Sequence, residues 1–237
     1  MTPETLFNDI TSYGETHVNQ ERIQKYLRYF KEGYDAYGLD HEQVETKVKE
    51  ILSIPSITQD LILELSLLLV KSPKYELTVI AIQLVRSYYK NWTIETFKTV
   101  EKWFGIGITN WAQTDYICGE LMNLFFKKGL IGLDSISVWR TAENKFQRRA
   151  AVVSLIKPMK ISQDFQPFFE FIDCMMMDPD REVHQGLGWF LREAWKKQPG
   201  PTEQFLLKWK NTSPRLIFQY ATEKMTPEGK QRFRKEK

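Results

Sequence analysis

The sequence predicts an all-α protein built from stacked helix pairs, and three observations support this prediction. Apolar residues recur at helical spacing along most of the chain, as in residues 77–85. No segment alternates strictly between apolar and polar residues, as a half-buried strand would. Small-residue segments near Val79–Ala81, Ala150-Ala151 and Gly186–Gly188 recur at multiples of roughly 36 residues, which is typical of helical repeats that stack on their neighbours. Such a stack curves, and its concave side is the expected binding surface.

The first two helices are located by their start and stop signals. Thr2 can cap a helix in which Pro3 occupies the first position, and Gly14 is expected to end that helix. Asn19 can cap a second helix that runs to Phe30. Both caps supply a side-chain oxygen to backbone amides of the first turn, which have no partner within the helix.

The following helices have similar signals. Asp40 and Gln43 have the spacing of a capping box. Thr58 or Asp60 opens the next helix, and Ser72-Pro73 opens the one after it. Helical periodicity then predicts further helices at about 94–104, 109–127, 133–142, 144–156, 162–177, 180–197, 201–209 and 213–223.

Composition restricts the class of protein. The chain has 237 residues, of which 42% are hydrophobic and 27% charged, as in ordinary globular proteins. Its net charge of +3 permits nucleic-acid binding without requiring it. The N-terminus lacks the basic segment followed by an apolar segment that is typical of a signal peptide, and no apolar run is long enough to span a bilayer. We therefore expect a cytoplasmic protein. Scattered histidines and cysteines argue against a metal site, and phosphate-loop and nucleophile-elbow motifs are absent.

The chain contains no Pro/Gly/Ser-rich linker long enough to divide it. We therefore expect one continuous repeat domain at residues 1–225 and a monomeric protein. Residues 226–237 form a polar, strongly basic tail that is free to fray.

Four residues could form a binding site on the concave side. Trp111 and Asp115 are four positions apart, so they share one helix face. Arg149 and Trp189 follow at steps close to the repeat length, so they are expected to face the same groove. A carboxylate, a guanidinium and two indoles are suited to holding a phosphodiester and a cationic base.

Several motifs, taken together and in this order, resemble those of the AlkD-like DNA alkylation repair glycosylases, and the resemblance covers most of the chain. The motifs are Tyr34-x-x-Tyr37-Gly38-Leu39, Ser72 to Leu84, Asn110-Trp111-x-x-x-Asp115, Arg149-Ala150-Ala151 and Gly188-Trp189-x-Leu191-Arg192-Glu193. This resemblance implies a superhelix of HEAT-like repeats, an α-solenoid, with a concave DNA-binding groove. It also implies that cationic N3- or N7-alkylated purines are removed from duplex DNA without a metal or organic cofactor.

The resemblance assigns a role to each matching residue. Asp115 matches the catalytic carboxylate, and Trp111 and Trp189 match the aromatic walls beside the lesion. Arg149 matches an arginine near the damaged strand, and Arg192 matches the arginine that follows the second tryptophan. The chemistry agrees with these roles, because a carboxylate can stabilise the positive charge that develops on the sugar as the glycosidic bond breaks.

Basic residues near these motifs are candidate contacts to the DNA backbone. Adjacent helical residues diverge by about 100°, so only one of Arg148 and Arg149 is expected to face the groove. The Arg-Ala-Ala match favours Arg149, which leaves Arg148 solvated or in contact with a phosphate. The candidate backbone contacts are Arg148, Arg192, Lys145, Lys196 and Lys197.

The sequence departs from the family at one place and leaves other functions open. The family often has Trp-Asp-x-Val-Asp, whereas Ala112, Gln113 and Thr114 separate Trp111 from Asp115 here. Asp115 could also simply stabilise the N-terminus of its helix. Two alternatives therefore remain: a non-catalytic binder of damaged or branched DNA, and a protein-binding helical repeat.

Overall fold

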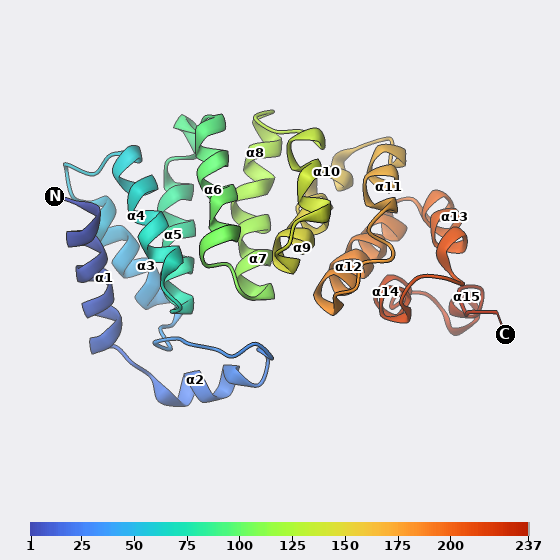
Figure 1. Cartoon of the computed structure of the whole chain (residues 1–237), viewed down its shortest axis with the longest axis horizontal. Helices are drawn as coiled ribbons and strands as arrows, with labels where there is room; N and C mark the ends of the chain where they lie inside the picture. The colour runs from blue at the N-terminus through green and yellow to red at the C-terminus, as the bar shows by residue number, and fades with distance from the viewer. Residues whose placement is uncertain (237) are drawn as a thin grey trace. The chain divides into compact units, whose positions relative to one another are not determined.

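A computed structural model describes residues 1–236, and it confirms the all-α prediction (Figure 1). No strand occurs in this range. By their internal contacts the residues form two compact units, Met1–Leu124 and Phe125–Lys237, whose boundary falls within α8 (Asn123–Lys127). The sequence contains no linker at this boundary, and a single repeat domain over residues 1–225 stays a prediction. None of the helices within residues 1–236 is long and apolar enough to cross a membrane.

The helices of the first unit pack against one another, except α2, which lies apart from the others (Figure 1). Its core includes Ile62, Leu65, Ile80, Leu84 and Trp103, all fully buried. Helix α5 contacts α3, α4 and α7, so it is the central element that positions α7. The helices of this unit are α1 (Pro3–Thr16), α2 (Gln20–Leu27), α3 (His41–Leu52), α4 (Gln59–Lys71), α5 (Tyr75–Ser87), the 3₁₀ turn η1 (Tyr89–Asn91), α6 (Ile94–Ile106), α7 (Trp111–Ile117) and the π-helical segment η2 (Cys118–Met122).

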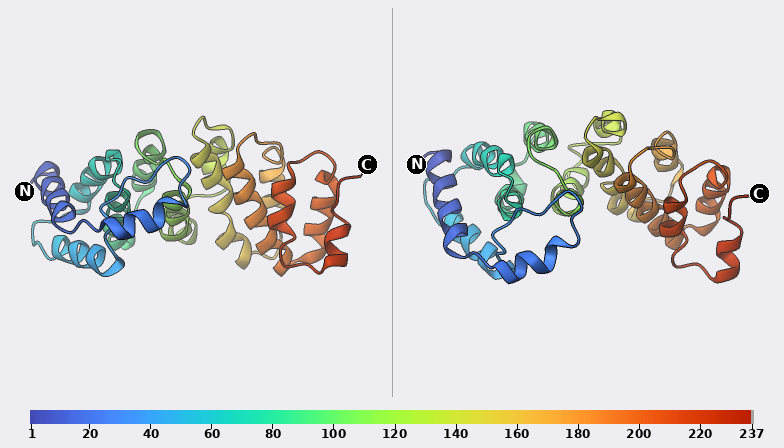
Figure 2. Two further views of the ribbon diagram at one scale, coloured as in Figure 1. Left: turned by 90° about the horizontal axis from the view of Figure 1, so that it is seen from below. Right: turned by 60° about the horizontal axis from the view of Figure 1, so that its bottom comes forward.

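The second unit is likewise helical, and Figure 2 shows its helices from two further directions. Helix α12 is central, because it packs against α9, α10, α13 and α14. The helices are the 3₁₀ segment η3 (Asp134–Thr141), α9 (Lys145–Val153), α10 (Ile156–Ile161), α11 (Gln166–Asp173), α12 (Arg181–Lys197), α13 (Pro199–Trp209), α14 (Arg215–Ala221) and α15 (Pro227–Gln231).

Most of the predicted helix starts are confirmed. The Thr2, Asn19 and Thr58 side chains accept hydrogen bonds from the first turns of α1, α2 and α4. Asp40 and Gln43 form both hydrogen bonds of the capping box of α3. These caps could be predicted from the sequence because each depends on residues only three positions apart.

Several predicted boundaries are wrong. Helix α1 continues past Gly14 to Thr16. This glycine provides space for the Tyr37 ring, because an added Cβ would lie 2.5 Å from it. Helix α2 ends at Leu27, before the predicted Phe30. The predicted helix at 109–127 is interrupted by the π-helical turn, and the one at 133–142 is a 3₁₀ segment.

The described part of the basic tail is partly helical, and fraying of its end stays a prediction. It forms α15 and buries Phe233, which is only 1% exposed. Arg215 donates to the Phe233 carbonyl at 2.9 Å, and the Glu236 carboxylate pairs with Lys210. The last residue, Lys237, lies outside the described residues.

The glycines of α12 allow close helix packing. A Cβ at Gly188 would lie 2.4 Å from Tyr220 Cβ and 2.8 Å from the Ile217 carbonyl oxygen, both on α14. The close neighbour of Gly188 is therefore α14. A Cβ at Gly186 would lie 3.4 Å from Arg149 Cγ, so this glycine accommodates the arginine stem.

We expect Gly188→Ala to destabilise the protein by about 1–3 kcal/mol, because the added methyl group forces α12 and α14 apart. The measurement is the free energy of unfolding by chemical denaturation. Gly105→Ala in α6 is the matched control, since a Cβ there meets no atom within 4 Å. The control should gain up to about 1 kcal/mol from higher helix propensity. Equal effects of the two substitutions would contradict the packing argument.

Candidate functional site

Helix α7 carries the first two predicted site residues, Trp111 and Asp115. Asn110 caps this helix, with its side-chain oxygen accepting from the Gln113 amide at 2.9 Å. The buried Gln113 side chain donates to Thr78 Oγ1 on α5 at 2.9 Å. The sequence between the two site residues, which departs from the family pattern, therefore attaches α7 to the core of the unit. Both site residues remain accessible: Trp111 is 37% exposed, and Asp115 is half-buried.

The loop that joins α2 to α3 (residues 28–40) holds the Trp111 indole in place. Trp111 Nε1 donates to the Tyr29 carbonyl oxygen at 3.2 Å. The Phe30 ring is stacked with the indole at a centroid distance of 5.8 Å and an interplanar angle of 18°. Phe30 is stacked in turn with Tyr34 at 4.5 Å. A hydrogen bond therefore fixes one edge of the indole, while part of the ring remains exposed to solvent.

A buried glutamate anchors this loop. Glu76, only 3% exposed, accepts hydrogen bonds from the backbone amides of Tyr37, Gly38 and Leu39 at 2.9, 2.6 and 3.1 Å. Gly38 has a φ of +81°, and a Cβ there would lie 2.4 Å from the Asn19 carbonyl oxygen. Sequence reasoning missed Glu76. An acid inside the apolar pattern of α5 was the available signal, since buried carboxylates require several donors.

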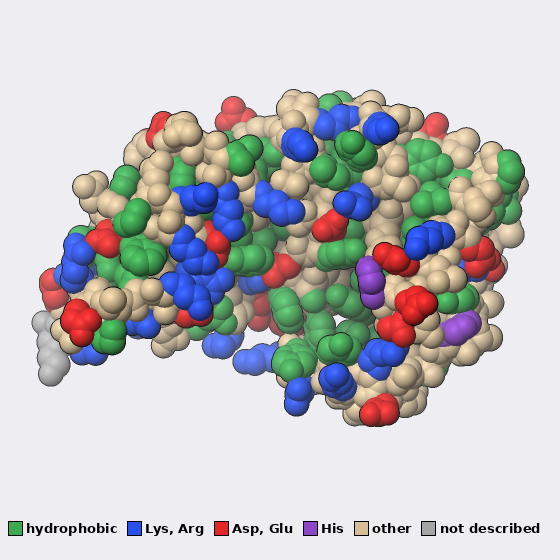
Figure 3. All heavy atoms as spheres, turned by 180° about the vertical axis from the view of Figure 1, so that it is seen from behind, with side chains coloured by type: hydrophobic (Ala, Val, Ile, Leu, Met, Phe, Trp, Pro, Cys, Tyr) green, Lys and Arg blue, Asp and Glu red, His purple; other side chains and the backbone are tan. Residues whose placement is uncertain are grey.

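An open cavity of about 750 Å³ lies beside Trp111 in the first unit. Aromatic side chains from α2, the loop and the helices α5 and α7 form much of its lining. Figure 3 shows the face of the molecule on which hydrophobic side chains surround a hollow. Burial raises the pKa of Tyr75 in this cavity to about 12, and the charges of Glu76, Tyr116 and Asp115 add to this effect.

In the second unit, Arg149 and Lys145 both interact with the start of α12. Arg149 is 5% exposed, and its Nη1 donates to the Glu182 carbonyl oxygen at 2.6 Å. Lys145 Nζ lies 3.2 Å from the Glu182 carboxylate and over the Phe146 ring at 5.1 Å. These contacts fix both basic side chains at the N-terminal end of α9.

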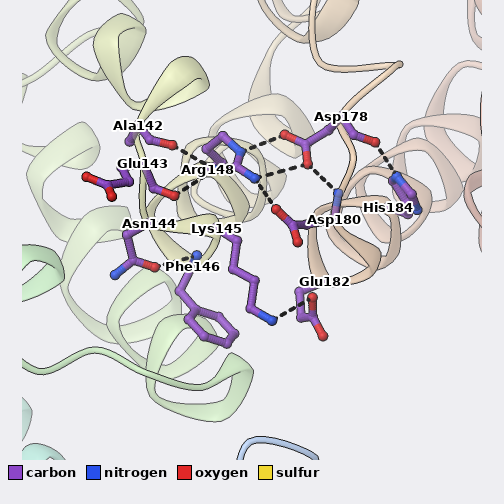
Figure 4. A network of polar contacts seen from close by, with 10 residues as sticks. All are labelled: Ala142, Glu143, Asn144, Lys145, Phe146, Arg148, Asp178, Asp180, Glu182 and His184. Atoms are coloured by element: carbon purple, nitrogen blue, oxygen red, sulfur yellow. Dashed lines mark hydrogen bonds and ion pairs between the residues drawn. The ribbon is translucent and has the colours of Figure 1, made fainter.

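The structure corrects the prediction that Arg148 is solvated or reaches a phosphate. Its guanidinium lies in the network of Figure 4, where Nε donates to Asp178 at 2.7 Å and Nη2 pairs with Asp180. Nη1 donates to the carbonyl oxygens of Ala142 and Glu143 at 2.7 and 3.0 Å. The side chain is 11% exposed, so it serves to join α9 to the segment before α12.

The remaining predicted residues lie on α12. Trp189 is half-buried, and Arg192 pairs with Glu223, which follows the end of α14. Lys196 and Lys197 are both exposed, and Lys196 pairs with Glu193 at 2.8 Å. On the face drawn in Figure 3, lysine and arginine side chains gather over the second unit. Trp111 and Asp115 thus belong to the first unit, and the other predicted residues belong to the second.

Glu193 gives the second unit a pH-dependent contact. Its carboxylate is 10% exposed; burial opposes ionisation, but hydrogen bonds and charges of Lys160 and Lys196 hold its pKa at about 2. A lowered folded-state pKa stabilises the fold above the ordinary value of 4.5, and this stabilisation is lost as the pH falls toward 2.

We therefore expect Glu193→Gln to be less stable than the native protein at neutral pH, with the difference shrinking between pH 4.5 and about 2. Denaturation midpoints measured across this range test the prediction. Glu64→Gln, at an exposed position of α4, is the control. A difference that stays constant with pH would show that the carboxylate charge is not involved.

The chain is similar to known proteins in sequence and in fold. The DNA alkylation repair enzyme family matches residues 15–225. No curated protein matches the chain. A structure from Enterococcus faecalis, described as a predicted DNA alkylation repair enzyme, is 16% identical with a TM-score of 0.71, and the match covers 89% of this chain and 98% of that one. AlkD2 from Streptococcus mutans is 19% identical with a TM-score of 0.59, and the match covers 86% and 99%.

A third structure, smu.31 from Streptococcus mutans UA159, is 20% identical with a TM-score of 0.58, and the match covers 78% and 92% of the two chains. At these identities the three structures show a shared fold. The family match is independent of them and spans most of the sequence. The chain therefore belongs to the DNA alkylation repair enzyme family.

Proposed function

We propose that the protein is a DNA glycosylase that hydrolyses the N-glycosidic bond of cationic N3- or N7-alkylated purines in duplex DNA. The observation that carries the proposal is the pairing on α7 of a fixed, partly exposed indole with a half-buried carboxylate one turn away. An indole face attracts a cationic base, and a carboxylate stabilises positive charge on the adjacent sugar.

The reaction requires little from the protein beyond these groups. An alkylated purine already carries a positive charge, so it leaves as a neutral base without being protonated. The sugar becomes positively charged as the bond breaks, and Asp115 lowers the energy of this state. A water molecule oriented by the same carboxylate adds its oxygen to C1′ and releases a proton, which leaves an abasic site. The mechanism needs neither a metal nor an organic cofactor.

Residues of the second unit are proposed to bind DNA. Arg149 and Trp189 are assigned to the damaged strand, while Lys196 and Lys197 at the end of α12 are assigned to phosphates. Each phosphate contact contributes about 0.9 to the slope of log affinity against log salt. Replacing the exposed Lys197 with Met should therefore reduce this slope by about 0.9, the contribution of one phosphate contact.

The direct test is base release from duplex DNA that contains a single 7-methylguanine, with unmodified duplex as the control substrate. Release of the free base, with an abasic site left in the strand, supports the proposal. Salt-sensitive binding of the lesion duplex without release would contradict it and favour a non-catalytic binder of damaged or branched DNA. Absence of both binding and release would favour a protein-binding helical repeat.

A further inference from the structure

The cavity beside Trp111 has the size and lining of a ligand site. Its volume of about 750 Å³ falls within the roughly 300–1,000 Å³ of small-molecule pockets. Its aromatic rings come from several elements of the first unit: Tyr26 and Tyr34 belong to α2 and the loop, and Tyr75 and Tyr116 belong to α5 and α7. Aromatic walls of this kind are typical of sites that stack a nucleobase.

Two hydroxyl groups in this cavity have unused hydrogen-bonding capacity. The Tyr116 hydroxyl accepts from Gln83 at 3.2 Å. By contrast, the hydroxyls of Tyr34 and Tyr75 make no hydrogen bond within residues 1–236, although both side chains are half-buried. Tyrosine hydroxyls usually have a partner when they are buried. Burial raises the pKa of Tyr75 to about 12, so this group remains a neutral donor at physiological pH.

The walls of the cavity are fixed by interactions among the segments that form them. Glu76 anchors the loop through three backbone amides, and Trp111 Nε1 joins the loop to α7 through the Tyr29 carbonyl. Arg22 donates to the Gly38 carbonyl and pairs with Asp40 at 3.2 Å. Because the loop is anchored at several points, a ligand would not have to order it, and this lowers the entropic cost of binding.

We infer that this cavity binds a single purine nucleobase, which stacks against its tyrosine rings and uses the Tyr34 and Tyr75 hydroxyls for its polar edge. The inference rests on the DNA substrate of the proposed function but not on the chemistry of Asp115. The base can come from two sources: a released base, or a base displaced from the duplex next to Trp111.

The first experiment titrates free 7-methylguanine into the whole protein by calorimetry. We expect saturable binding, weakened about fivefold or more by the double variant Tyr34→Phe/Tyr75→Phe, since two hydrogen bonds are lost. Tyr88→Phe is the matched control, because its hydroxyl donates to the Ile57 carbonyl instead. Unfolding midpoints confirm that the variants are folded. No saturable binding, or equal affinity of the native and double-variant proteins, would overturn the inference.

The second experiment separates the two sources. The Asp115→Asn variant is bound to fluorescent lesion duplex while free 7-methylguanine is added. Displacement of the duplex shows that a base still attached to DNA occupies the cavity, whereas simultaneous binding of both shows that the site receives the released base. Failure of the proposed function would be seen separately, as absence of base release by a native protein that still binds the free base.

Discussion

Asp115→Asn is expected to lower the rate of 7-methylguanine release at least about a hundredfold while leaving the affinity for the lesion duplex almost unchanged. The substitution keeps the size of the side chain and one acceptor oxygen, but it removes the charge and replaces the second oxygen with an amide donor. That charge is needed only when positive charge develops on the sugar, so the effect belongs in the chemical step and not in binding. Single-turnover release with saturating enzyme measures that step directly.

One control and one further site variant are compared with this result. Glu64→Gln makes the same kind of change at an exposed position of α4 in the same unit and should leave release unaffected. Trp111→Phe keeps an aromatic face but loses the donor to Tyr29, so it should weaken release mainly through a less fixed ring. A rate unchanged in Asp115→Asn would remove Asp115 from the mechanism, and the helix-stabilising explanation would then account for it.

The part of the site that depends on one helix could be predicted from the sequence. Trp111 and Asp115 share a face because of helical geometry alone. The residues between them illustrate the limit of this reasoning. Gln113 replaces part of the family pattern. Its role depends on a hydrogen bond to Thr78, which lies far away in sequence.

Features that depend on distant partners could not be predicted. The anchoring of the α2–α3 loop by Glu76 joins residues almost forty positions apart, which no local spacing reveals. The π-helical turn of η2 lies in a segment with ordinary helical periodicity. The expectation that Arg149, and not Arg148, faces a groove stays a prediction, and both residues are buried. The acids that neutralise Arg148 could not be predicted, because Asp178 and Asp180 follow a turn before α12.

Arg148→Met is expected to destabilise the protein by about 3–5 kcal/mol, because it leaves Asp178 buried without its countercharge. The Asp178 side chain is only 5% exposed, and it also accepts from the Asp180 amide at 2.9 Å. Chemical denaturation measures the loss. Arg148→Lys should restore little of it, since an ammonium group cannot replace the guanidinium that donates to carboxylates and carbonyls together.

A double-mutant cycle distinguishes this buried ion pair from a phosphate contact. Arg148→Met/Asp178→Asn should be more stable than the sum of the two single losses predicts, because the second change removes the uncompensated charge. Arg181→Met, at an exposed position at the start of α12, should change stability by less than about 0.5 kcal/mol. If Arg148→Met instead left stability unchanged and reduced the salt slope of DNA binding by about 0.9, the arginine would be a phosphate contact. The buried network makes the opposite outcome the expected one: a large loss of stability, with DNA binding affected only as far as the fold of the second unit is.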